Sequence, residues 1–189
     1  MRCANQKGVF VQTETEQTER FSRLSLHQSD RANPAETSAL SKPAGTTHST
    51  IINPQGLIKR WQYATNAASR RYKSLNTSIA RRWYLSALDL SERLLQTRLC
   101  AEHVAIHVIS LHNLADLESR LRRFDKARSY HEQALNRLFL LMRDNHDKLT
   151  LLFPHLHRCK MSLALFCRHY GSSSASNLLL RQSIPIGNH

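Results

Sequence analysis

The residues best suited to chemistry are cysteines and histidines in the middle of the chain. Cys100, His103 and His107 are spaced i, i+3 and i+7, so a continuous helix would place all three on one face. A thiolate and two imidazoles suit zinc, which usually takes four ligands. A fourth would have to come from His112 or from the cluster at residues 155–159, and nothing in the sequence brings these together. With 11 His in the chain, chance grouping is the stronger interpretation. We therefore assign no metal ligand and no cofactor.

A catalytic pair is equally hard to assemble. Cys167 and His169 lie two residues apart, and on a helix such residues point to different faces, so they cannot form an activated nucleophile locally. The sequence has only 5 Gly and no glycine-rich phosphate loop, and its carboxylates are scattered singly. We predict that the protein is not an enzyme.

The charge of the chain is more informative. Its 27 Lys and Arg exceed its 14 Asp and Glu, which gives a net charge of +13. Residues 1–56 hold six Lys and Arg against five Asp and Glu, which leaves +12 for residues 57–189. Arginine outnumbers lysine there, and its planar guanidinium suits carboxylate or phosphate. We expect an acidic partner, and nucleic acid is one of the candidates.

Two groups of cations form the predicted partner-binding surface. The first lies within residues 57–82, which contain no acidic residue, and comprises Lys59, Arg60, Arg70, Arg71, Lys73, Arg81 and Arg82. The second crowds residues 120–128 and comprises Arg120, Arg122, Arg123, Lys126 and Arg128. No catalytic or cofactor-binding residue is predicted beside them.

Aromatic residues are interleaved with the first group of cations. They are Trp61, Tyr63, Tyr72, Trp83 and Tyr84. Cations with aromatic rings suit a single-stranded nucleic acid, whose bases stack on the rings. The alternative, which we favour for Trp61, Tyr72 and Tyr84, is that their spacing marks core positions and that the arginines are the solvated face.

The elements that must position these residues are helices. The chain has 41% hydrophobic residues but few Gly and Pro for the turns of an all-β fold. Residues 1–53 are polar and are predicted to be a largely disordered tail. Asn53-Pro54 is a helix start signal. Apolar spacing then predicts helices over 57–74, 80–95, 101–121 and 124–144, and a fifth that ends before Gly171.

The third and fifth of these segments have features of their own. The segment over 101–121 is so broadly apolar that it must pack on more than one side. Pro154 either sits in the first turn of the fifth helix or kinks a longer helix that begins near Asp147. The predicted helical domain therefore covers residues 54–171, followed by a short C-terminal segment, residues 172–189.

Residues 110–135 resemble a tetratricopeptide repeat, a hairpin of two antiparallel helices that pack through small residues. The match comprises Asn113-Leu114-Ala115 in the first helix, Phe124-Asp125-x-Ala127 after the turn, and Ala134-Leu135. Arg122, Glu118 and His131 differ from the usual residues of the repeat. Weaker matches flank this unit, and Ala80 and Ala127 lie 47 residues apart, longer than the usual ~34, as in longer-helix variants.

The resemblance implies an all-α fold of antiparallel helix hairpins stacked as a short tetratricopeptide-like array, whose surface grips another protein. Together with the charge, it predicts an adaptor for protein-protein interaction that binds an acidic partner; a nucleic-acid-binding or regulatory protein that uses residues 57–82 is the alternative. No apolar run approaches the ~20 residues of a membrane span. We expect a cytoplasmic protein, and self-association through an apolar edge of so short an array.

Overall fold

The computed structural model describes residues 53–183, and this part of the chain is all-α and has no β-strand. Its elements are α2 (Pro54–Lys73), α3 (Thr77–Thr97), α4 (Ala101–Arg120), α5 (Phe124–Asp144), a short 3-10 helix η1 (His146–Lys148), α6 (Leu149–Tyr170) and α7 (Ser174–Arg181). The predicted fold class is confirmed. The tail predicted over residues 1–53 lies outside the described residues, except for Asn53.

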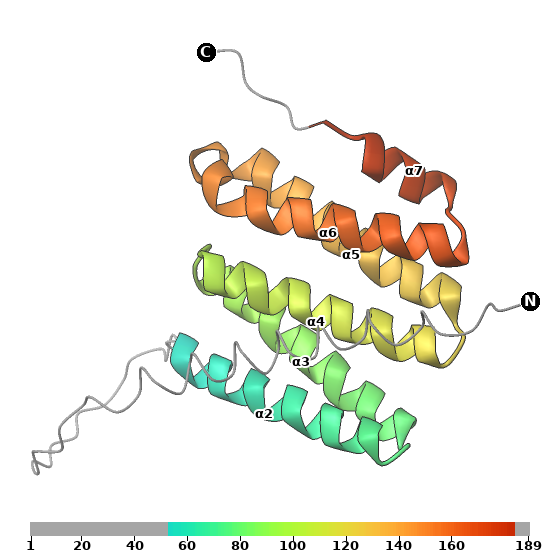
Figure 1. The fold of residues 1–189 in the computed structure, drawn as a ribbon. Coiled ribbons are helices and arrows are strands. Elements are labelled where there is room, and N and C mark those ends of the chain that lie inside the picture. The colour runs from blue at the N-terminus through green and yellow to red at the C-terminus, as the bar shows by residue number, and fades with distance from the viewer. Residues whose placement is uncertain (1–52, 184–189) are drawn as a thin grey trace, which may run out of the picture. The chain divides into compact units, whose positions relative to one another are not determined.

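Successive helices form antiparallel hairpins that stack in chain order. Residues 74–76 join α2 to α3, and residues 121–123 join α4 to α5, so each pair must reverse direction within three residues. Figure 1 shows the α2–α3, α4–α5 and α6–α7 hairpins following one another. The connections 74–76, 121–123 and 171–173 therefore lie at the same end of the stack, which we call the turn end. Within residues 53–183, none of the helices combines the length and apolarity that a bilayer span requires.

The helix starts have local causes that the sequence signals indicated. The Asn53 side chain accepts hydrogen bonds from the backbone N–H groups of Gln55 (3.1 Å) and Gly56 (3.3 Å), and Pro54 follows in the first turn. Asn76 caps α3 in the same manner by accepting from Ile79 N at 3.3 Å. Such caps satisfy backbone donors that would otherwise lack partners, and each contributes about 1 kcal/mol.

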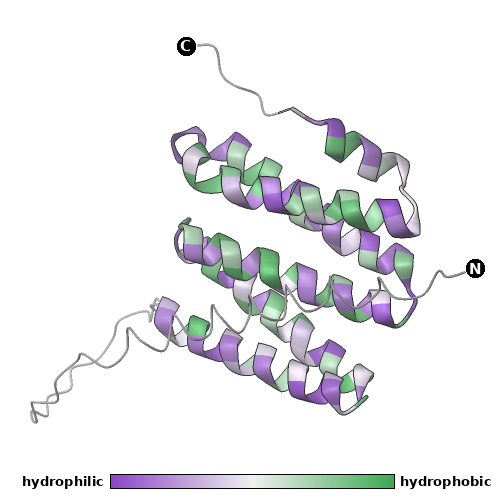
Figure 2. Cartoon of the chain, viewed as in Figure 1, coloured by the Kyte–Doolittle hydropathy of each residue, from purple (hydrophilic) through white to green (hydrophobic). Residues whose placement is uncertain are grey.

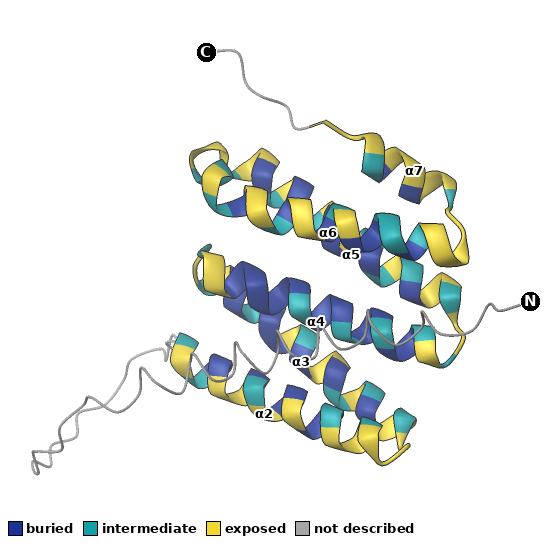
Figure 3. Ribbon diagram, viewed as in Figure 1, coloured by how far each residue is buried: buried dark blue, intermediate teal, exposed yellow. Residues whose placement is uncertain are grey.

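The core runs through the stack, and α4 is its central element. Figure 3 shows α4 buried along most of its length, whereas α2 exposes a full face to solvent. Figure 2 shows that α4 is also the more hydrophobic of the two helices, in green. Leu114 and Leu117 of α4 share a core cluster with Ala68 of α2 and Tyr84 of α3, and Val104 belongs to the cluster formed with α5 and α6. The prediction that this helix packs on more than one side is confirmed.

The first two hairpins have matching bounds. Each helix of the second hairpin begins and ends 47 residues after its counterpart in the first, since 54–73 corresponds to 101–120 and 77–97 to 124–144. Ala80 and Ala127, the alanines that the sequence paired at this distance, occupy equivalent positions, and both are fully buried. The two turns, residues 74–76 and 121–123, are therefore also equivalent to each other.

The two turns also share one backbone conformation. Leu75 and Arg122 adopt the left-handed region, with φ of 60° and 57°. In both turns the residue that follows donates its N–H to a carbonyl five residues back, Asn76 to Arg71 O and Arg123 to Glu118 O. This is the Schellman ending of a helix, in which glycine usually takes the left-handed position. In the second turn this position is occupied by Arg122, whose backbone is therefore strained.

The strained position in the first turn gives a prediction on stability. Leu75→Gly should stabilise the fold by about 0.5–1 kcal/mol, because relief of the left-handed strain exceeds the entropy that glycine adds to the unfolded chain. The Leu75 side chain is 87% exposed, so its removal costs little packing. Urea denaturation followed by circular dichroism measures the effect. Ser74→Gly is the control, because Ser74 has an ordinary φ of −84° and should lose stability instead.

The last part of the fold adds one helix that the sequence analysis did not anticipate. Residues 174–181, inside the predicted C-terminal segment, form α7, and Leu179 is buried in the core shared with α5 and α6. The Ser173 hydroxyl accepts from Ser176 N at 2.9 Å and caps the helix. Pro154 lies inside α6, six residues after Lys148. Pro154 therefore lies beyond the first turn of a helix that begins close to Asp147.

Candidate functional site

The two predicted groups of cations meet at one buried carboxylate. Glu118, in the last turn of α4, has no exposed surface. Its Oε1 lies 2.7 Å from Nε of Arg81 on α3, and its Oε2 lies 3.5 Å from Nη1 of Arg123 in the second turn. One cation from each group thus pairs with the same carboxylate, which ties the first hairpin to the turn of the second.

A second contact joins the two hairpins at the same end. The guanidinium of Arg120 lies over the ring of Tyr72, with Cζ 4.8 Å from the ring centroid. Cations attract the negative face of an aromatic ring, and such a contact contributes roughly 0.5–1 kcal/mol where it is partly exposed. Tyr72 is half-buried and packs against the core cluster that contains Ala68 and Tyr84, so it lies at the edge of the core, whereas its spacing predicted a core position.

The remaining predicted cations divide by position. Arg128 is mostly buried and pairs with Asp125 at 2.8 Å, so it is engaged within α5. Lys59 and Arg60 are exposed near the start of α2. The exposed cations at the turn end are Arg70, Arg71, Lys73, Arg82, Arg120, Arg122, Arg123 and Lys126. We call this set the basic turn end.

The interleaved aromatic residues separate into core and surface. Trp61 and Tyr84 are buried, and the Trp61 indole N–H donates to the Ser110 hydroxyl at 2.8 Å. These two residues are therefore core positions, as we favoured. Tyr63, by contrast, is 62% exposed, and its ring meets that of the half-buried Trp83 edge to face, with centroids 5.7 Å apart. Of the five interleaved aromatic residues, Tyr63 is the one classed as exposed, and Trp83 lies beside it.

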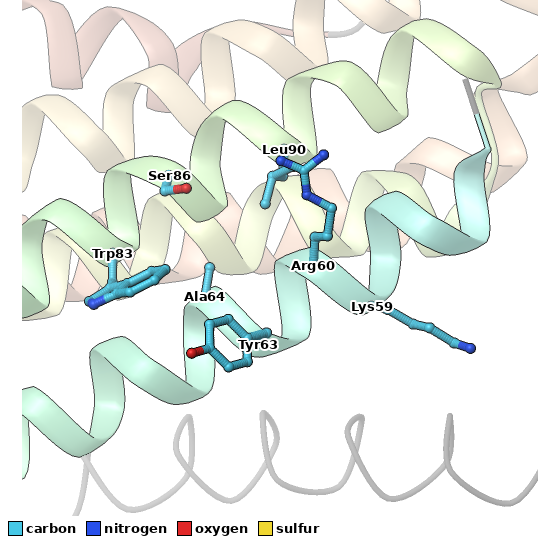
Figure 4. A pocket seen from close by; sticks show the side chains of 7 residues that line it. All are labelled: Lys59, Arg60, Tyr63, Ala64, Trp83, Ser86 and Leu90. Atoms are coloured by element: carbon cyan, nitrogen blue, oxygen red, sulfur yellow. The ribbon is translucent and has the colours of Figure 1, made fainter. Parts of the chain in front are cut away.

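Tyr63 and Trp83 border an open pocket of about 290 Å³ between α2 and α3. Ala64 and Leu90 supply further apolar lining, and Ser86 lies on the α3 side. Figure 4 shows the Tyr63 and Trp83 rings beside Ala64, with the Lys59 side chain extending away from the helices. The cations Lys59 and Arg60 complete the lining. The pocket therefore combines an apolar, aromatic surface with positive charge.

The two histidines that suggested a metal site have other hydrogen-bond partners, and Cys100 is a half-buried free thiol at the start of α4. His103 Nδ1 donates to the backbone carbonyl of Arg98 at 2.8 Å, and His107 Nδ1 is hydrogen-bonded to the Ser91 hydroxyl at 3.0 Å. Both rings are buried. Across residues 53–183, no three or more of the His, Cys, Asp and Glu side chains are grouped as metal ligands would be.

Two other histidines belong to a line of rings that crosses from α4 to α6. The ring centroids of His112 and His131 lie 5.2 Å apart, and His131 lies 5.2 Å from Phe166. Phe166 in turn contacts Tyr170, which stacks on Phe124 at 4.4 Å. Burial lowers the pKa of His112 to about 3, helped by the neighbouring His131 and Arg158, and burial lowers the pKa of His131 to about 4. The imidazoles of His112 and His131 are therefore uncharged at pH 7 and contribute to packing.

Sequence reasoning missed the role of Glu118 and the pocket. Nothing local to Glu118 shows that Arg81, 37 positions earlier, will reach it. The exposure of Tyr63, however, could have been predicted from the sequence, because Tyr63 follows Lys59 by four residues and precedes Arg70 by seven. Those spacings place the tyrosine on the charged face of α2, opposite the core.

Comparison with known proteins gives a family but no function. Neither the curated proteins nor the solved structures gave a significant match. The model of a family described as "Protein of unknown function (DUF2753)" matches residues 59–184, which span α2 to α7 almost completely. Since this match covers more than half of the 189 residues, the chain belongs to the DUF2753 family.

Proposed function

We propose that this chain is a non-enzymatic binding protein that holds an acidic region of another protein against its basic turn end. The observation that carries the proposal is that the second group of cations and all of the first group except Lys59 and Arg60 lie at one end of the stack. Glu118 fixes Arg81 and Arg123 there, and most of the other cations of that end stay exposed.

Electrostatics supports an acidic partner. The helix α2 has five Lys and Arg and no acidic residue, and three of these cations, Arg70, Arg71 and Lys73, fall in its last turn. Cations there interact favourably with the helix dipole, so the helix tolerates them without a carboxylate nearby. A surface with one sign of charge attracts an oppositely charged partner and speeds its association, and salt weakens both effects.

The helix hairpins support a binding role rather than catalysis. Two hairpins with matched bounds stack on each other. Their resemblance to tetratricopeptide repeats suggests the usual use of such stacks, which is to hold another chain on an extended surface. On this proposal the protein is an adaptor, and the turn end is the part that recognises charge.

Charge reversal at the turn end tests this proposal. We expect the triple variant Arg70→Glu, Arg71→Glu and Lys73→Glu to bind fluorescent poly-glutamate at least tenfold more weakly in an anisotropy titration at 50 mM salt. The matched control reverses three exposed arginines away from that end, Arg98, Arg143 and Arg181. Circular dichroism confirms that both variants are folded. Equal losses in the two variants would show that only net charge matters, and the turn end would then have no special role.

Nucleic acid is the second candidate, and one observation favours it. Tyr63 presents an exposed ring beside Lys59 and Arg60, an arrangement on which a base of a single strand can stack. Titration of the full chain with a labelled single-stranded RNA at 50 and 200 mM salt tests it. Binding that falls steeply with salt and also requires Tyr63 would support this function, and absence of binding at 50 mM salt would exclude it.

A further inference from the structure

We propose that the pocket between α2 and α3 holds one aromatic side chain of the acidic partner segment, and that this segment then runs along α2 to the basic turn end. The inference rests on the proposed function and adds to it a second point of contact. It also gives the partner a sequence character, namely an aromatic residue followed or preceded by acidic residues.

The geometry of α2 connects the two points of contact. Five residues of α2 follow one another at steps of four, three, four and three, a spacing that keeps them on one face of a helix. They are Lys59, Tyr63, Asn66, Arg70 and Lys73. All five are exposed. This stripe begins beside the pocket and ends at the turn end, so a bound chain can contact both without crossing another helix.

The pocket itself suits one aromatic ring. A volume of about 290 Å³ is at the small end of ligand sites, which fits a single side chain better than a cofactor. Tyr63 and Trp83 meet edge to face, an arrangement that a third ring can extend, and Ala64 and Leu90 provide an apolar surface for it. Lys59 and Arg60 flank the same pocket. An acidic residue of the partner next to the bound aromatic residue would therefore lie close to Lys59 or Arg60 and could pair with it.

The length of the stripe sets the spacing in the partner. From Tyr63, which borders the pocket, to Lys73 at the far end of the stripe, the helix rises about 15 Å at 1.5 Å per residue. An extended peptide covers about 3.3 Å per residue, so about five residues span that distance. Acidic residues up to five positions from the aromatic residue can thus reach the turn end. The polar groups of the lining are the Ser86 and Tyr63 hydroxyls, the Trp83 indole N–H and the two cations. Because Ala64 and Leu90 make the rest of the lining apolar and a base edge is polar, we favour a peptide over a nucleic acid as occupant.

Synthetic peptides test the inference with the full chain. The first peptide has a central Phe with five Asp or Glu on each side, and the second replaces only the Phe with Ala. A nine-nucleotide RNA is the third probe. We expect the Phe peptide to bind at least tenfold more tightly than the Ala peptide and to change the fluorescence of Trp83. The chain has only two tryptophans, and because Trp61 is buried, a Trp83→Phe variant should remove that change.

Two variants separate the pocket from the turn end. Tyr63→Ala should abolish the tenfold advantage of Phe over Ala while leaving the affinity for the Ala peptide nearly unchanged. Leu85→Ala removes another exposed apolar side chain, on α3, and should preserve the advantage. The triple reversal of Arg70, Arg71 and Lys73 should weaken both peptides by similar factors.

The outcomes distinguish the inference from the proposed function. Equal binding of the two peptides, sensitive to the triple reversal, would overturn the aromatic anchor and leave the acidic-partner function intact. Failure of both peptides to bind would overturn both. Binding of the RNA alone, with dependence on Tyr63, would overturn the peptide as occupant and assign the pocket to nucleic acid instead.

Discussion

The Glu118→Ala variant is expected to lose about 3–5 kcal/mol of unfolding free energy, the usual cost of removing one partner from a buried ion pair. Glu118 is fully buried and lies 2.7 Å from the Arg81 guanidinium. Alanine would leave a cavity and a cation without its counterion. Because Arg81 is 34% exposed and can turn toward water, we expect a value near the lower end of that range.

Equilibrium urea denaturation of the Glu118 variants measures this loss. Glu118→Gln keeps the shape of the side chain and should lose less than alanine does. The double variant Arg81→Leu, Glu118→Leu removes both charges and should recover much of the stability, because an apolar pair can replace a buried ion pair with little loss. Asp89→Ala, an exposed carboxylate on α3, is the control and should change stability by less than about 0.5 kcal/mol.

A loss below about 1 kcal/mol for Glu118→Ala would contradict the role that we give the carboxylate. It would mean that this ion pair adds little to the other contacts between the first and second hairpins, such as that of Arg120 with Tyr72. The expected result has a consequence for function as well, because Arg123 also pairs with Glu118 at 3.5 Å. The variant should therefore loosen the second turn and weaken peptide binding in the fraction that stays folded.

The helices were predictable because their signals are local. Asn53 and Pro54 mark one start, Gly171 marks one end, and the apolar spacing between them repeats with the period of a helix. The α7 helix was missed because eight residues are too short for a clear period, and because the serines before it resemble a terminator. In the structure, Ser173 instead caps α7 and bonds to Glu132 of α5 at 2.7 Å.

The candidate site was only partly predictable, because its key contacts join residues far apart in sequence. Charge counting found both groups of cations. A count cannot show that Arg81 forms an ion pair with Glu118, or that Arg128 forms one with Asp125. Spacing correctly assigned Trp61 to the core. It did not reveal that Trp83 would meet Tyr63, because the register of two packed helices depends on how their side chains fit, not on the period of either helix.

Acid is expected to unfold this protein well before its carboxylates are protonated, because three buried histidines resist protonation in the folded state. Burial lowers the pKa of His107 to about 4, against the opposing effect of Glu92, and the charge of Arg137 lowers it further. His112 and His131, with pKa values of about 3 and 4, behave likewise. In the unfolded chain each imidazole returns to a pKa near 6.5.

The sign of the effect follows from these directions. As the pH falls below 6.5, the unfolded chain takes up protons that the folded chain refuses, so the free energy of unfolding decreases. Each histidine contributes about 1.4 kcal/mol per pH unit until its folded pKa is reached. Three of them contribute up to about 4 kcal/mol per unit between pH 6 and pH 4. Since a domain has about 5–15 kcal/mol in total, we expect unfolding near pH 5.

Urea denaturation at pH 7.5, 6.5 and 5.5 measures the slope of stability against pH. His112→Gln and His131→Phe each remove one buried imidazole, so each should reduce that slope below pH 6.5 by about 1.4 kcal/mol per unit, even where the variant is less stable at neutral pH. The exposed His146 supplies the control, and His146→Gln should leave the slope unchanged. A wild-type stability that stays constant from pH 7.5 to 5.5 would contradict the prediction, because it would show that the buried rings accept protons without unfolding.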